Sequence, residues 1–123
     1  MEIGKTLTVE QLVTQRESAA HYGSGLLQVY ATPSMVALME NAAHQLAKLF
    51  LTETEDTVGI EINIKHTKAT PVGDKVSAQA TLTAVEGKKL FFTVRAFDSK
   101  GEVGSGTHIR YIINPKEFME RIS

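Results

Sequence analysis

The spacing of apolar residues changes its period once along the chain. Between Pro33 and Phe50 apolar residues recur every three or four positions, which predicts a helix. These residues cover much of the helix circumference, so we expect the helix to be buried on several sides. They are Val36, Met39, Ala43, Leu46, Ala47 and Phe50.

From residue 58 onwards the period becomes two, which is typical of strands. Apolar residues alternate with polar residues or glycine from Val58 through Ile60, Ile62 and Ile64, and His66 continues the apolar series. This pattern predicts one strand whose apolar face points at the helix. Further strands are predicted over 76–84, 89–97 and 102–113, and the short glycine-containing turns between them predict an antiparallel meander.

The two ends of the chain carry shorter predicted elements. Residues 3–13 are expected to form a first strand, and residues 14–30 to be loop or short elements. Asn114, Pro115 and Glu117 combine a cap residue, a first-turn proline and an acidic third position, which predicts a short C-terminal helix.

One long buried helix followed by four or five antiparallel strands predicts an α+β fold. The sheet can bury such a helix only by curling around it, which describes a hotdog fold over a single domain, residues 1–123. Phe91, Phe97 and Ile112 are assigned to the opposite face of the sheet and favour further burial in an oligomer.

Composition excludes several kinds of function. The net charge of −1 comes from scattered charges, so no surface for nucleic acid is expected. The absence of cysteine excludes disulfides, thiolate catalysis and cysteine-based zinc sites. No metal site is expected, because His21 and His108 have no partners at ligand spacing. No signal peptide or membrane span is visible, so a soluble cytoplasmic protein is expected.

The helix carries the residues that point to chemistry. Thr32 is expected as its N-cap and Pro33 as its first residue. Glu40 is a single carboxylate in an apolar helix, which requires a partner, a proton or a catalytic task. His66 is the best candidate partner, because its strand should face the helix. A hydroxyl, a carboxylate, an imidazole and the N–H groups at a helix start are the groups that acyl transfer requires.

Each of these residues also has a purely structural interpretation. Thr32 can serve only as a cap, Glu40 can pair with His44 one turn later, and His66 can bond a backbone carbonyl at a strand end. The Gly104-Ser105-Gly106 segment lacks the spacing of a nucleophile elbow and instead favours close backbone approach within a strand.

Several short segments, taken in order, resemble the fluoroacetyl-CoA thioesterase family of the hotdog superfamily over nearly the full chain. They are Ala31–Val36 with Glu40 eight residues after Thr32, Thr57–Gly59, Ile64–His66, Ala69–Gly73, Val85–Leu90, Gly106–His108 and Arg110–Ile113.

The resemblance implies roles for individual residues. Thr32, Glu40 and His66 would form the catalytic set, Gly59 would lie near the thioester carbonyl, and Arg110 would lie near the active site.

The fluoroacetyl enzyme also has an aromatic lid before the catalytic threonine. The corresponding residues 23–27 contain no Phe, and Leu26 takes the place of the substrate contact. Selectivity for a fluorinated acyl group is therefore not expected.

The resemblance implies an acyl-CoA thioesterase that hydrolyses a small acyl-CoA to free acid and CoA. It needs no cofactor, since CoA is part of the substrate. A homodimer without nucleic-acid or membrane partners is expected. Two alternatives stay open, namely a hotdog acyl-CoA hydratase or dehydratase that uses a His and a carboxylate, and a non-catalytic acyl-CoA binding module.

Overall fold

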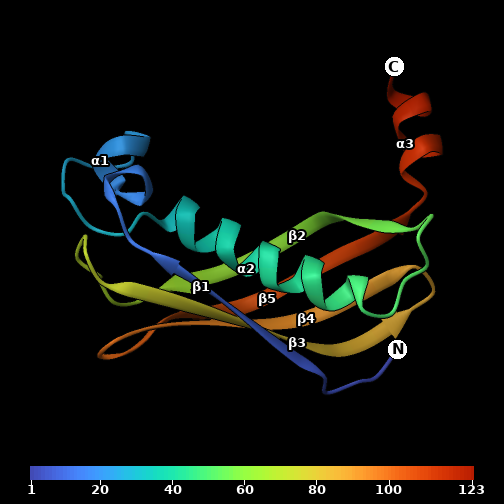
Figure 1. The fold of residues 1–123 in the computed structure, drawn as a ribbon, viewed down its shortest axis with the longest axis horizontal. Coiled ribbons are helices and arrows are strands. Elements are labelled where there is room, and N and C mark those ends of the chain that lie inside the picture. Colours follow the sequence, from blue (N-terminus) through green and yellow to red (C-terminus); the bar gives the residue numbers. More distant parts are fainter.

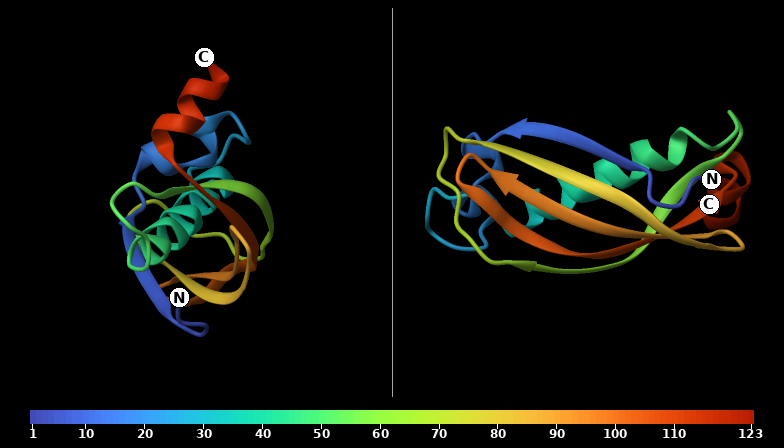
Figure 2. Two further views of the ribbon diagram at one scale, coloured as in Figure 1. Left: turned by 90° about the vertical axis from the view of Figure 1, so that its right-hand side faces the viewer. Right: turned by 90° about the horizontal axis from the view of Figure 1, so that it is seen from below.

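One long helix, α2 (Thr32–Lys48), lies along the concave side of a five-stranded sheet in the computed structural model, which describes residues 1–123 (Figure 1). Viewed along the long axis of the molecule, the sheet curves around this helix (Figure 2). The predicted α+β fold with a wrapped central helix is thus confirmed. The strands are β1 (Thr6–Leu12), β2 (Asp56–His66), β3 (Lys75–Glu86), β4 (Lys89–Asp98) and β5 (Gly101–Ile113).

The strands are all antiparallel and follow the order β1-β3-β4-β5-β2. The predicted meander holds for β3, β4 and β5 only. The predicted pairing of β2 with β3 is wrong. Residues 67–74 do not form a tight turn between neighbouring strands but carry the chain from β2 at one edge of the sheet to β3 near the other edge. As a consequence β1 and β2 are the two edge strands, and β2 has one side without a partner strand.

The core lies between α2 and the inner face of the sheet. Met35, Met39 and Leu46 of α2 are completely buried, and β3 buries alternate residues from Val76 to Leu82. Burial of each such large apolar side chain stabilises the fold by about 1.5–3 kcal/mol. The helix therefore presents one apolar side to the sheet. Ala37, Asn41 and Gln45 on its other side are exposed, so the prediction that the helix is buried on several sides is wrong for the single chain.

An irregularity in β2 changes which residues face the helix. The pairing with β5 shifts between Gly59 and Glu61, so Ile60 is an extra residue in this strand. An extra residue reverses the alternation of the side chains that precede it. Ile62, Ile64 and His66 follow the predicted inward pattern. The prediction for Ile60 is wrong, because 51% of it is exposed, and Val58 belongs to the outer face.

The remaining elements are short. Residues 14–30 contain a 3-10 turn, η1 (Gln15–Glu17), and a single helical turn, α1 (Ala19–Tyr22). The predicted C-terminal helix is α3 (Pro115–Ile122), capped by Asn114 Oδ1, which accepts the Glu117 N–H at 3.1 Å. α3 projects away from the sheet (Figure 1).

Two further observations complete the fold. Ile112, which was assigned to the outer face, instead packs against the core. No helix is both long and apolar enough to cross a membrane.

Candidate active site

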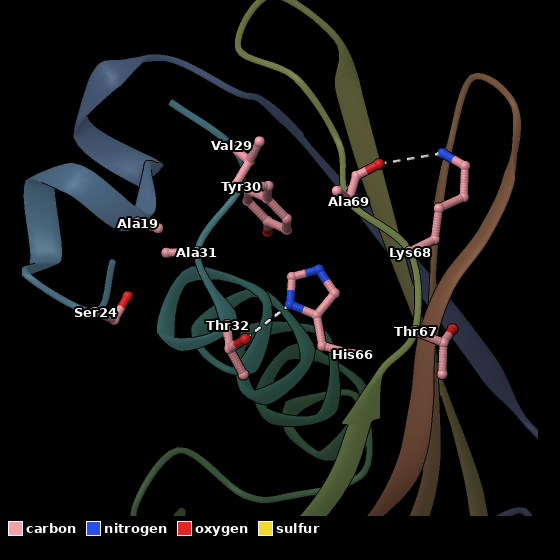
Figure 3. Close-up of a pocket in the computed structure, with 10 residues that line it drawn as sticks. All are labelled: Ala19, Ser24, Val29, Tyr30, Ala31, Thr32, His66, Thr67, Lys68 and Ala69. Atoms are coloured by element: carbon pink, nitrogen blue, oxygen red, sulfur yellow. Dashed lines mark hydrogen bonds between the residues drawn. The ribbon is translucent and has the colours of Figure 1, made fainter. Parts of the chain in front are cut away.

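Thr32 does not cap its helix. α2 begins at Thr32 itself, Ala31 occupies the N-cap position, and no side chain caps the helix through a hydrogen bond. The prediction of Thr32 as N-cap and Pro33 as first residue is therefore wrong by one position. The Thr32 hydroxyl is instead engaged by His66, with Oγ1 2.8 Å from Nδ1 (Figure 3).

His66 is the last residue of β2, and its ring points inward to the start of α2. Burial lowers the pKa of His66, although the backbone of Lys68 opposes the shift. The imidazole is therefore neutral at pH 7. With its proton on Nε2, the ring accepts the Thr32 O–H through Nδ1, which is the arrangement a general base requires.

The Thr32–His66 pair opens on a cavity of about 330 Å³ between residues 19–31 and the end of β2 (Figure 3). Its lining is mostly small and uncharged: Ala19, Ser24, Val29, Tyr30, Ala31, Thr32, His66, Thr67, Lys68 and Ala69. Leu26, the expected substrate contact, is not among these residues, and 94% of it is exposed. Of residues 23–27, only Ser24 lines the cavity.

Glu40 lies in a different pocket. Eight residues of helix separate Thr32 from Glu40, a rise of about 12 Å along the axis. No hydrogen bond joins Glu40 to His66, so the predicted pair is not formed within one chain. The alternative pairing with His44 is not formed either, because His44 Nε2 lies 2.7 Å from Asp56 Oδ1. Glu40 instead shares a pocket of about 460 Å³ with Gly59 and Arg110.

Arg110 is buried and held in one orientation by β2. Its Nε donates to Thr57 Oγ1 at 2.8 Å, and its Nη2 donates to the Thr57 carbonyl at 3.0 Å. Its Nη1 lies 3.2 Å from His108 Nε2. Burial lowers the pKa of Arg110, and the charge of Glu40 opposes that shift. The guanidinium thus keeps its charge inside the protein, beside the Glu40 carboxylate.

His108 completes this network. Its Nδ1 lies 2.7 Å from the Glu61 carbonyl, which can only accept, so Nδ1 carries the proton. Nε2 is then free to accept from Arg110. Burial is the main factor that lowers the pKa of His108, so its ring stays neutral. Sequence reasoning missed the roles of His108 and Thr57. The available signal was that His108 and Arg110 are two residues apart in a predicted strand, which places both on the same face.

Gly59 leaves a gap beside these charged groups. A Cβ atom at this position would lie 3.1 Å from Glu40 Oε2 and 3.3 Å from Arg110 Nη1. The absence of a side chain therefore opens space for a small polar group next to a carboxylate and a guanidinium.

The catalytic candidates thus form two groups in each chain. The first, which we call the Thr–His half-site, consists of Thr32 and His66 at the end of β2. The second, the Glu–Arg half-site, consists of Glu40, Gly59 and Arg110 near the beginning of β2. The first group supplies a hydroxyl with a base, and the second supplies charges around an open gap.

Comparison with known proteins identifies the family. The model of the fluoroacetyl-CoA-specific thioesterase family matches residues 13–116. The fluoroacetyl-CoA thioesterase of Streptantibioticus cattleyicolor is 34% identical over 99% of this chain and 92% of its own. A crystal structure of a fluoroacetyl-CoA thioesterase variant with acetyl-CoA has a TM-score of 0.93 at 34% identity and covers 99% of this chain and 96% of its own.

A more distant structure bears on the fold alone. A hot-dog-like protein from Thermanaerovibrio acidaminovorans has a TM-score of 0.89 at 20% identity, and the match covers 98% of this chain and 89% of that one. The fold is therefore the hotdog fold, as predicted. With the family model matching most of its length, this chain belongs to the fluoroacetyl-CoA-specific thioesterase family.

Proposed function

We propose that this protein hydrolyses a small acyl-CoA thioester to the free acid and CoA. The observation that carries the proposal is the 2.8 Å contact between Thr32 Oγ1 and a neutral His66, at the edge of a cavity large enough for a short acyl group. Membership of a thioesterase family supports the same activity.

In this proposal His66 accepts the proton of the attacking oxygen. When Thr32 Oγ1 attacks, the thioester C–S bond breaks, CoA leaves as the thiol after taking a proton, and water then hydrolyses the acyl-threonine ester. When water attacks directly, Thr32 positions it and His66 takes its proton. In both routes negative charge develops on the thioester oxygen, and the N–H groups at the start of α2 favour it.

Glu40 and Arg110 take part only if another chain brings them to the Thr–His half-site, and we propose that a homodimer does so. β2 is an edge strand, and Ile60 is exposed on it. Two such strands paired antiparallel about a twofold axis would bring the His66 end of one β2 toward the Gly59 end of the other. Each Thr–His half-site would then meet the Glu–Arg half-site of the second copy.

The deciding experiment measures free thiol released from a panel of short acyl-CoA thioesters. We expect turnover with release of one thiol per acid formed, and loss of turnover in the Thr32→Ala variant. An enoyl absorbance change without thiol release would instead indicate a hydratase. Binding of acyl-CoA by calorimetry without any product would indicate a binding module, and either result would overturn the proposal.

A further inference from the structure

Asp98 is a fully covered carboxylate that the proposed chemistry does not use. It is the last residue of β4, and 0% of its side chain is exposed. It accepts hydrogen bonds from Thr70 Oγ1 and from the Lys100 backbone N–H, both at 2.8 Å, and it forms an ion pair with Lys68. These partners come from two segments of the chain, the β4–β5 turn and the segment after β2.

The charge of Asp98 is stabilised in place. Burial raises the pKa of this carboxyl, but the hydrogen bonds from Lys68, Lys100 and Thr70 outweigh it and bring the pKa down to about 2. Asp98 is therefore ionised throughout the neutral range, and removing its charge would leave the Lys68 ammonium without its partner.

The segment that Asp98 holds follows His66 in the chain and bonds the backbone that precedes Thr32. Lys68 and Thr70 follow His66 directly, within residues 67–71. The Thr70 carbonyl accepts the Tyr30 N–H at 2.8 Å, and Val29 forms a β-bridge with Pro71. Residues 29 and 30 lead straight into α2 and Thr32. Figure 3 shows the two backbone segments lying on either side of the pair.

We propose that Asp98 is a positioning residue for the Thr32–His66 pair. By fixing residues 67–71, it fixes the end of β2 that carries His66 and the backbone that leads to Thr32, although it touches neither side chain. This inference rests on the proposed function, because it assigns a catalytic purpose to the geometry of that pair. Displacement of a reacting group by about 1 Å can cost roughly 100-fold in rate.

The Asp98→Asn variant tests the proposal, with Glu102→Gln as its matched control. Asn keeps the size of the side chain but removes its charge. Glu102 lies in the same β4–β5 hairpin and pairs with Arg95 at 2.6 Å, but this pair is exposed and its side chains form no hydrogen bond with residues 67–71. We expect kcat to fall about 10- to 100-fold in Asp98→Asn with KM changed less than about threefold, and both to stay unchanged in Glu102→Gln.

A second readout separates positioning from a general loss of stability. If the Thr32–His66 contact loosens and His66 becomes more accessible, the lowered pKa of His66 should rise toward its ordinary value. NMR titration of the histidine rings, with the His66 signal assigned through His66→Ala, measures this shift in Asp98→Asn. Thr70→Val, which removes one hydrogen bond of Asp98, should shift this pKa and kcat in the same directions if Asp98→Asn does not fold.

The measurements distinguish failure of the role proposed for Asp98 from failure of the proposed function. A folded Asp98→Asn or Thr70→Val variant with the kcat and the His66 pKa of Glu102→Gln would overturn the proposal, as would reduced thermal stability with an unmoved His66 pKa. The NMR titration needs no substrate. If the wild-type protein releases no thiol from any acyl-CoA, the proposed function fails, and the titration still decides whether Asp98 holds His66 in place.

Discussion

The hydroxyl of Thr32 is available for chemistry because α2 does not use it as a cap. Its hydrogen-bond partner is His66, and the side chain otherwise faces solvent and the cavity. Thr32 therefore does not have the purely structural role of a helix cap. This also changes what a substitution at this position should do to stability.

Substitution of Thr32 should therefore separate activity from stability. We expect Thr32→Ser to keep substantial thiol release, because it keeps the hydroxyl. Thr32→Ala should lose about 100- to 10,000-fold in kcat. Because only one hydrogen bond is lost, its free energy of unfolding should fall by about 1 kcal/mol or less. Thiol-release kinetics and denaturant unfolding measure the two effects. Equal losses in Thr32→Ser and Thr32→Ala would show that the hydroxyl is not the reacting group.

The pH dependence of activity should follow His66. Burial lowers the pKa of this ring, so its neutral form persists below the usual histidine pKa of about 6.5. As pH falls through the lowered pKa, protonation removes the base. We therefore expect kcat/KM to decline at acid pH with its midpoint below about 6.5. A midpoint of the decline above about pH 6.5 would contradict a neutral, partly buried His66.

Substrate selectivity should be modest at the acyl group. The cavity is lined by small residues, and Leu26 lies outside its lining. Contacts with small apolar differences are worth only about 1–3 kcal/mol. We expect kcat/KM for acetyl-CoA and fluoroacetyl-CoA to agree within roughly two orders of magnitude. Parallel thiol-release assays measure the ratio, and a preference of many thousandfold for fluoroacetyl-CoA would refute this view of the cavity.

Among the elements, β2 shows most clearly where sequence reasoning succeeds and where it stops. The period of two was enough to predict the strand and the inward direction of His66. It could not reveal the extra residue at Ile60, because the apolar alternation continues unbroken through this position. The result is that Thr57 and Gly59, rather than Val58 and Ile60, face inward.

At the start of α2, sequence reasoning likewise predicted the element but not the partner of Thr32. Thr32 followed by Pro33 has the residue types of an N-cap and a first turn, so local sequence favours the cap. The competing partner, His66, is distant in the chain and becomes available only in the folded sheet. Glu40 was rightly singled out as a carboxylate in an apolar helix, but its neighbours Arg110 and His108 depend on strand pairing. Long-range register therefore decided the parts of the site that sequence reasoning missed.

The gap at Gly59 can be tested by adding a single methyl group. In Gly59→Ala the new Cβ would lie 3.1–3.3 Å from the ends of the Glu40, His108 and Arg110 side chains. These ends can move by a few tenths of an ångström, so we expect a folded protein. If substrate occupies this gap, thiol release should fall by at least about tenfold. Steady-state kinetics together with thermal melting check this, and unchanged kinetics in a folded variant would remove Gly59 from the site.

Considered as a whole, a single chain carries both halves of the proposed site without joining them. The Glu40 carboxylate is directed to Arg110 and Gly59, while His66 has no carboxylate partner. The unpaired edge of β2 lies between the two half-sites. In the proposed dimer, pairing of two such edges would satisfy the exposed backbone of each edge strand and would join the half-sites in one step.

Mixing of two inactive variants tests this assembly directly. Light scattering at micromolar concentration should first give the mass of a dimer. Thr32→Ala damages the Thr–His half-site and Glu40→Gln damages the Glu–Arg half-site, so each variant alone should be nearly inactive. If each site combines half-sites from two chains, a mixed dimer has one intact site. Since half of the dimers in an equal mixture are mixed, about a quarter of wild-type activity should return.

A matched control uses two variants damaged in the same half-site. In mixed dimers of Thr32→Ala and His66→Ala, neither chain offers an intact Thr–His half-site, so no activity should return. The chains must be co-expressed or unfolded and refolded together, because an interface of paired strands exchanges slowly. Recovery in the first mixture and none in the second would require sites shared between chains. No recovery in either, with mixed dimers demonstrated by mass spectrometry, would mean that Glu40 acts within its own chain.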